Sequence, residues 1–113
     1  MQQLLPELRA KLPAQCSALL VTPCWVEVVP DWLNKGTALR KIMQQCGIHP
    51  DEAVAFGDGE NDLGMLKSVT HGYAMSNAFS SVLEQIPLHA PANTEDGVAK
   101  PICKLCGYSD LLP

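Results

Sequence analysis

An acidic turn enclosed by glycines constrains this chain more than any other feature of its sequence. The apolar run from Ala53 to Phe56 has the length and residue types of a buried β-strand, and it leads directly into Gly57-Asp-Gly-Glu-Asn-Asp62. Glycines at these positions allow a tight turn and a close approach of the backbone to a ligand. Helix-forming residues follow from Asn61, so the acidic side chains are predicted to lie between a strand and a helix.

Helical and extended segments alternate throughout the chain after Lys35. The predicted elements are a helix over 36–46 that ends at Gly47, a strand over 53–56, a helix over 61–69, a strand over 72–75, a helix over 78–85, a short strand near Leu88 and a last helix from about Asp96 to Cys106. Because no hairpin turn signals separate these elements, crossover connections are expected. The predicted fold class is therefore α/β, with a parallel sheet and helices against its faces.

The first 30 residues have a different pattern. Gln2 to Leu12 carries leucines at helical spacing, with Pro6 suited to the helix start and Pro13 to its end. Two mostly apolar runs follow, at 17–21 and 25–29, the second rich in valine, and we expect them to pair as antiparallel strands.

Composition excludes several classes of function. The 113 residues are 47% hydrophobic with a net charge of −4, which suits one modest globular unit and offers no basic surface for nucleic acid or an anionic membrane. No apolar stretch approaches the roughly 18 residues of a membrane span, and the first residues do not resemble a signal peptide, so a cytoplasmic location is expected. Among the five cysteines only Cys103 and Cys106 have a recognised spacing, and we predict buried or half-buried thiols on a helix rather than a disulfide or a zinc site.

The acidic turn is a candidate cation site. Ligand sites of open α/β sheets lie at the carboxyl ends of the strands, where Asp58, Asn61 and Asp62 are predicted. Oxygen ligands of this kind suit Mg²⁺. The structural alternative is that Asp62 only caps a helix and Asp58 is a turn residue. An EF-hand is excluded, because Leu63 replaces its glycine and Val69 its terminal glutamate.

Four segments in order resemble the haloacid dehalogenase-like phosphatases, most closely their Cof-type group. The matching segments are Val26-Glu-Val-Val-Pro30 with Asn34-Lys-Gly-Thr-Ala-Leu39, Phe56-Gly-Asp-Gly-Glu-Asn-Asp62 with Met65-Leu66, Gly72-Tyr-Ala-Met-Ser-Asn-Ala78, and Glu95-Asp-Gly-Val-Ala99. The resemblance covers roughly residues 16–105 and departs from the usual pattern at Ser76-Asn77 and Ala92-Asn-Thr94. It implies a Rossmann-like catalytic core and hydrolysis of small phosphorylated metabolites.

The resemblance also assigns roles to single residues. Lys35 and Asp58 would be catalytic, with Lys35 neutralising charge on the phosphate and Asn61 assisting phosphate binding. Asp58, Asn61 and Asp62 would hold Mg²⁺ and its water shell, and Asp62 would also orient Lys35.

The family's nucleophile has no counterpart in the sequence. The family uses an Asp-x-Asp pair, and none occurs in these 113 residues. The family's second motif is a serine or threonine after an apolar strand, and Thr22 resembles it. In the family a whole cap domain separates that motif from the lysine, and the 13 residues from Thr22 to Lys35 are too few to form one. The resemblance implies that residues 1–30 are the end of a cap domain and 31–113 the C-terminal half of a catalytic core. We expect a truncated chain that is inactive alone.

Two partners could complete such a chain: a polypeptide carrying the missing N-terminal half, or a second copy that covers an open sheet edge. A non-catalytic protein-binding module or a truncated gene product is the alternative to a phosphatase. A redox role for Cys103 and Cys106 is a third hypothesis.

Overall fold

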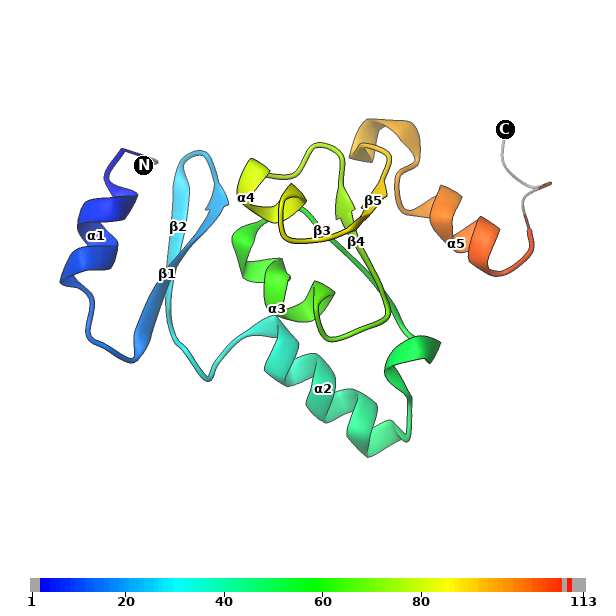
Figure 1. Cartoon of the computed structure of the whole chain (residues 1–113), viewed down its shortest axis with the longest axis horizontal. Coiled ribbons are helices and arrows are strands. Elements are labelled where there is room, and N and C mark those ends of the chain that lie inside the picture. The colour runs from blue at the N-terminus through cyan, green and yellow to red at the C-terminus, as the bar shows by residue number, and fades with distance from the viewer. Residues whose placement is uncertain (1–2, 109, 111–113) are drawn as a thin grey trace.

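Two separate sheets organise the chain in this computed structural model, which describes residues 3–108 and 110 (Figure 1). β1 (Cys16–Thr22) and β2 (Trp25–Pro30) form an antiparallel hairpin. β3 (Val54–Gly57), β4 (His71–Met75) and β5 (Leu88–Ala90) form a parallel sheet in the order β3-β4-β5. The predicted α/β class, the antiparallel pairing near the N-terminus and the parallel sheet after Lys35 are all confirmed.

Residues 5–30 form what we call the hairpin unit. Its helix α1 (Leu5–Lys11) has Pro6 in its first turn and ends before Pro13, as predicted. Leu5, Ala18 and Leu20 form its small buried centre, against which Phe79 packs from the other part of the chain. The two strands therefore rest on a helix on one side and on a distant segment at their end.

Residues 34–105 form what we call the core unit. Its longest helix, α2 (Lys35–Cys46), begins with a capping box in which Asn34 Oδ1 accepts a hydrogen bond from the Thr37 backbone N–H at 2.9 Å. The helix ends at Gly47, as predicted. This cap fixes where α2 begins, and so it places Lys35 at the first position of the helix.

The remaining helices are shorter than the sequence predicts. A 3₁₀ turn over Glu60–Asp62 precedes α3 (Leu63–Leu66), and α4 spans Ser80–Leu83 because Phe79 before it has an extended backbone. The predicted start of the last helix at Asp96 is wrong. Asp96 adopts a left-handed conformation with φ 56°, and α5 runs only over Ala99–Leu105.

One hydrophobic cluster lies between the parallel sheet and the helices α2, α3 and α4. Its buried members are Met43, Ala55, Leu66, Val69, Ala74, Val82 and Ile86. They come from two strands, three helices and the segments between them, so burial of this cluster fixes the packing of the core unit.

β3 pairs only with β4 among the described residues, and its other edge is unpaired, the open sheet edge that the family resemblance implies. Val54 on this strand is 39% exposed. α5 lies apart from the rest of the core unit in Figure 1. Val98, which precedes this helix, and Ile102 and Leu105 within it are exposed and lie three or four residues apart. The core unit therefore leaves apolar surface uncovered at its sheet edge and its last helix.

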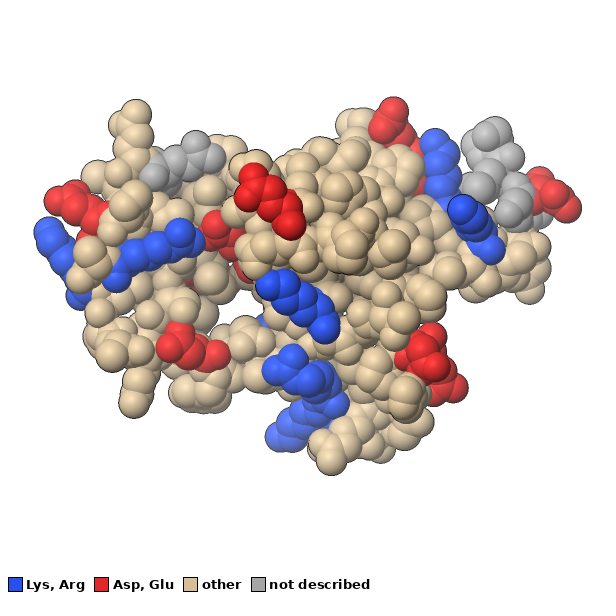
Figure 2. Space-filling view, in the orientation of Figure 1, with Lys and Arg blue, Asp and Glu red and all other residues tan. Residues whose placement is uncertain are grey.

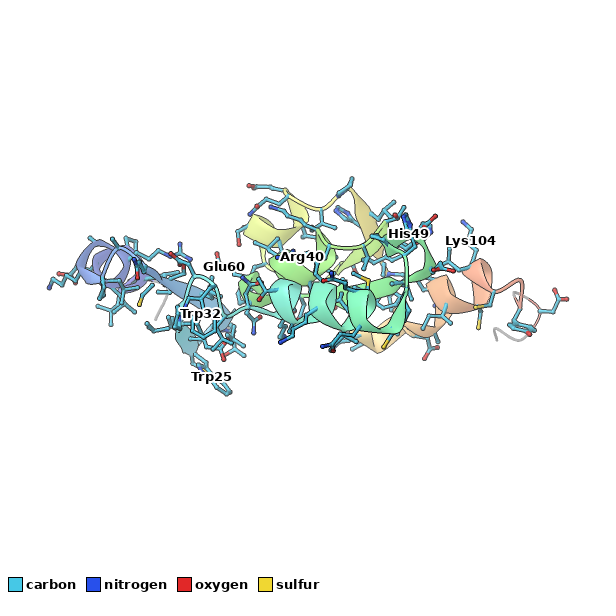
Figure 3. The ribbon with its side chains drawn as sticks, turned by 90° about the horizontal axis from the view of Figure 1, so that it is seen from below. Trp25, Trp32, Arg40, His49, Glu60 and Lys104 are labelled. Atoms are coloured by element: carbon cyan, nitrogen blue, oxygen red, sulfur yellow. The ribbon has the colours of Figure 1, made fainter. Side chains whose placement is uncertain are left out.

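The surface carries further features that bear on the predictions. Cys103 is half-buried as predicted, but Cys106 is exposed, because it follows α5 where the helix leaves the core unit. Trp25 and Trp32 are both exposed and project together from the hairpin side of the molecule (Figure 3). None of the helices in the described part of the chain is long and apolar enough to cross a membrane. Positions 109 and 111–113 of the tail lie outside the described residues.

Candidate functional site

Asp62 joins the start of α2 to the acidic turn. Its side chain is buried, and one carboxylate oxygen pairs with Lys35 Nζ, from 27 residues earlier in the chain. The other oxygen, Oδ2, accepts hydrogen bonds from the backbone N–H groups of Asp58 at 3.0 Å and Gly59 at 3.1 Å. A single carboxylate thus shapes the turn and holds the lysine ammonium beside it, the contact that the family resemblance implies.

Two glycines make this arrangement sterically feasible. A Cβ on Gly36 would lie 2.3 Å from the Gly64 carbonyl oxygen, so α2 and α3 approach each other at a distance that only glycine allows. A Cβ on Gly57 would lie 2.4 Å from Asp62 Cβ, in the space that the buried carboxylate occupies. The glycines therefore do more than permit a turn, because they bring Lys35 and Asp62 together.

Asp58 differs from Asp62 in its surroundings. It follows β3 directly, its side chain is exposed, and within the described part of the chain no group donates a hydrogen bond to its carboxylate. Its backbone carbonyl accepts from the Phe79 N–H at 3.2 Å, which anchors the turn to the start of α4. An accessible, unpaired carboxylate at a strand end has the chemistry of a ligand for a hard cation.

The other predicted metal ligands are less free. Both oxygens of Asp62 are already engaged, and Asn61 donates its amide to Glu27 Oε2 at 3.4 Å. Within residues 3–108 and 110, no group of three or more His, Cys, Asp or Glu side chains is arranged to hold a metal. Asp58 alone fits the part of a direct ligand, and the metal and catalytic roles of Lys35, Asp58, Asn61 and Asp62 stay predictions.

Glu60 connects the acidic turn to the hairpin unit (Figure 3). Its Oε2 accepts from Arg9 Nη2 at 2.6 Å and from the Leu20 backbone N–H at 2.9 Å, and its Oε1 accepts from Ser81 Oγ at 3.0 Å. The Glu60 side chain is only 12% exposed. Both oxygens therefore serve as bridges, one to α1 and β1 and the other to α4.

Sequence reasoning missed Glu27 and Glu60 as site residues. Glu60 lies inside the acidic turn, between Gly59 and Asn61, and that position is the signal that could have drawn attention to it. Glu27 interrupts an otherwise apolar strand, which is the corresponding signal for a polar group aimed at a site. The partners of Glu60, Arg9 and Ser81, carry no signal in the sequence.

A carboxyl group with a shifted pKa lies away from this group of residues. A hydrogen bond from the His49 ring lowers the pKa of the Asp51 carboxyl on the exposed 3₁₀ turn Pro50–Glu52. This turn connects α2 to β3 and contributes no side chain to the site.

Comparisons with known proteins identify the family. A model of the haloacid dehalogenase-like hydrolases matches residues 1–102. A chloroplastic endoribonuclease YBEY of Arabidopsis thaliana is 36% identical over 77 residues, which are 68% of this chain and 13% of that protein. A 5-amino-6-(5-phospho-D-ribitylamino)uracil phosphatase of Bacillus subtilis is 38% identical over 81 residues, which are 72% of this chain and 32% of that protein.

A solved structure agrees with these matches. The structure of a haloacid dehalogenase-like hydrolase from B. subtilis is similar with a TM-score of 0.79 and 26% identity, covering 93% of this chain and 38% of that one. This chain thus spans less than half the length of each of these relatives. The family match and the shared fold confirm the resemblance: the chain belongs to the haloacid dehalogenase-like hydrolases.

Proposed function

We propose that this chain supplies the lysine and the acidic turn of a magnesium-dependent phosphatase that acts on small phosphorylated metabolites. The observation that carries the proposal is the buried Asp62 carboxylate, which pairs with Lys35 through one oxygen and accepts from the backbone N–H of the exposed Asp58 through the other. Membership of a hydrolase family and a curated relative named as a phosphatase of a phosphoribityl compound support it.

Lys35 is suited to bind a phosphate. Its side chain is 50% exposed and lines a cleft, while Asp62 fixes the position of the ammonium group. A positioned cation of this kind stabilises the charge that develops on a phosphoryl group during transfer. Asp62 keeps the lysine in place, and it would do the same when a phosphate replaces water beside Nζ.

Asp58 would hold Mg²⁺, which supplies charge neutralisation at the transferred phosphate when bound. Asn61 lies three residues further along the turn and would contact the water shell of the ion or the phosphate itself. The contact between Asn61 and Glu27 is long, at 3.4 Å, which leaves the amide free to reorient.

The nucleophile would come from a strand outside these 113 residues. No Asp-x-Asp pair occurs in the sequence, and the free edge of β3 is the position from which a parallel neighbour would bring its carboxyl end next to Asp58. That strand would belong to the same polypeptide or to a separate one. A second copy of this chain is the other candidate to cover the edge, and light scattering of the purified chain distinguishes a monomer from a dimer. We place this activity in the cytoplasm, in keeping with five unpaired cysteines.

Cation binding tests the proposal without requiring turnover. Mn²⁺ substitutes for Mg²⁺ at oxygen sites and can be titrated by electron paramagnetic resonance. We expect Asp58→Asn to weaken Mn²⁺ binding at least about tenfold, because it removes the only free carboxylate at the turn. Asp51→Asn removes an exposed carboxylate outside the site and should leave the affinity unchanged.

Two results would contradict the proposal. Equal Mn²⁺ affinity in the native chain and in Asp58→Asn would remove Asp58 from the cation site. Magnesium-dependent hydrolysis of p-nitrophenyl phosphate by the isolated chain, lost in Asp58→Ala, would show that the nucleophile lies within these residues after all.

A further inference from the structure

A cleft of about 340 Å³ separates the hairpin unit from the start of α2, and Figure 2 shows open space between these parts of the molecule. Its volume is at the lower end of the range for small-molecule sites. The lining residues that matter here are Leu19, Glu27, Val29, Leu33, Lys35 and Asn61. The cleft therefore opens onto Lys35, where the phosphate would bind, and extends along β2.

The walls of the cleft are mostly aliphatic. Leu19 and Val29 come from the same face of the hairpin, since Leu19 pairs with Glu27 in the sheet and Val29 lies two residues further along β2. Leu33 contributes from the segment between β2 and α2. These walls suit the carbon chain of a ligand, and they offer it no charge.

Glu27 is the one acidic side chain among the described residues that line this cleft. It is half-buried, and it accepts one long hydrogen bond, from Asn61 Nδ2 at 3.4 Å. The carboxylate therefore has acceptor capacity to spare. An adjoining hollow of about 220 Å³ adds Asp31, while its other acid, Glu60, is paired with Arg9. Glu27 is opposite in charge to Lys35, which lines the same cleft.

We propose that Glu27 selects the leaving group of the substrate: a phosphomonoester whose leaving group carries hydroxyl or amino donors and no second anionic group. This inference rests on the proposed function. An ionised carboxylate accepts hydrogen bonds from such donors, and it repels a carboxylate or a second phosphate held against it in a partly desolvated cleft. The phosphate would lie at Lys35, the carbon chain along Leu19 and Val29, and the donor group at Glu27.

Glu27→Gln separates this role from a structural one. Glutamine keeps an oxygen that accepts from Asn61, so the contact between β2 and the acidic turn is retained while the negative charge is lost. Glu84→Gln is the matched control, because Glu84 is an exposed acid that follows α4 and does not line the cleft.

The experiment compares two esters that differ at one end. Sorbitol 6-phosphate and 6-phosphogluconate are both six-carbon acyclic phosphates, but the first ends in a hydroxymethyl group and the second in a carboxylate. Dissociation constants are measured by NMR titration of the full chain with Mg²⁺ present. We expect the native chain and Glu84→Gln to bind sorbitol 6-phosphate at least about tenfold more tightly than 6-phosphogluconate. In Glu27→Gln the two dissociation constants should agree to within about threefold.

Inorganic phosphate is the third probe, because it has no leaving group. Phosphate binding by the native chain, lost in Lys35→Ala, together with equal affinity for the two esters, would overturn the role of Glu27 and leave the proposed function standing. The role of Glu27 would also be overturned if Glu27→Gln left the ratio of the two ester dissociation constants unchanged. No binding of any probe by the native chain would overturn both proposals.

Discussion

The hairpin unit and the core unit are stabilised in different ways. The core unit buries seven hydrophobic residues in one cluster, whereas the hairpin unit buries three and completes its cluster with Phe79 from the core unit. A two-stranded sheet is marginally stable in water unless something packs against it. The hairpin unit therefore depends on the core unit for its stability, and the core unit does not depend on the hairpin unit to the same degree.

Besides the packing of Phe79, polar contacts join the two units close to the site. Glu60 accepts hydrogen bonds from Arg9 and from the Leu20 N–H, and Asn61 donates to Glu27. Since both residues belong to the acidic turn, the orientation of the hairpin over the cleft is linked to the conformation of the turn. A substitution in the acidic turn should therefore alter the conformation of the hairpin before that of the parallel sheet.

The largest effect is expected from the centre of the core unit. Leu66 is 2% exposed, and Leu66→Ala should lower the free energy of unfolding by about 3 kcal/mol, because it leaves a cavity in the hydrophobic cluster. Urea denaturation followed by circular dichroism measures the change. Both sheets should unfold together at a lower urea concentration.

Leu33→Ala is the control, because Leu33 is 53% exposed and the change should be below about 0.5 kcal/mol. Hydrogen exchange of the hairpin amides provides the contrary outcome. If these amides stay protected at urea concentrations that unfold the core unit of Leu66→Ala, the hairpin unit does not depend on the core unit for its stability.

A smaller effect, confined to the hairpin unit, is expected from Glu60→Gln. The substitution removes the charge that strengthens the hydrogen bonds to Arg9 and the Leu20 N–H, so opening of the hairpin should become about tenfold more frequent. Hydrogen exchange of the β1 and β2 amides reports this, while β3 and β4 should exchange as before. Glu84→Gln serves as the control, and a uniform increase over both sheets would show that the units open as one.

The smallest effect is expected on the outer face of α1. Lys11 and Glu7 form an exposed ion pair at 3.9 Å, and Lys11→Gln should change the free energy of unfolding by less than about 0.5 kcal/mol. The measurement is the urea midpoint at low and high salt. A loss above about 1 kcal/mol would mean that α1 contributes more to the hairpin unit than its three-residue cluster suggests.

Much of the fold could be predicted because its signals are local. Gly47 and the prolines around α1 each mark a boundary through the conformation of one or two residues. The starts of α3 and α5 could not be predicted in this way. A 3₁₀ turn held by the Asp62 carboxylate delays the first, and the left-handed backbone of Asp96 delays the second.

In the site, too, the residues that could be predicted are those with a local signal in the sequence. The glycine-bracketed turn is readable as a motif, and the pairing of Lys35 with Asp62 followed from the family resemblance. Glu60 and its partners Arg9 and Ser81 are 51 and 21 residues apart in the chain, so no local pattern relates them. Only the packing of α1 and α4 against the turn brings these side chains together.

The two exposed tryptophans have a practical consequence. The sequence contains no others, and Trp25 and Trp32 lie on the hairpin unit and the segment that joins it to α2. Trp25 also shares a face of β2 with Glu27, since side chains alternate along a strand. The unmodified chain thus carries its own optical reporter, because its indole fluorescence arises only from the hairpin unit and the segment that follows it.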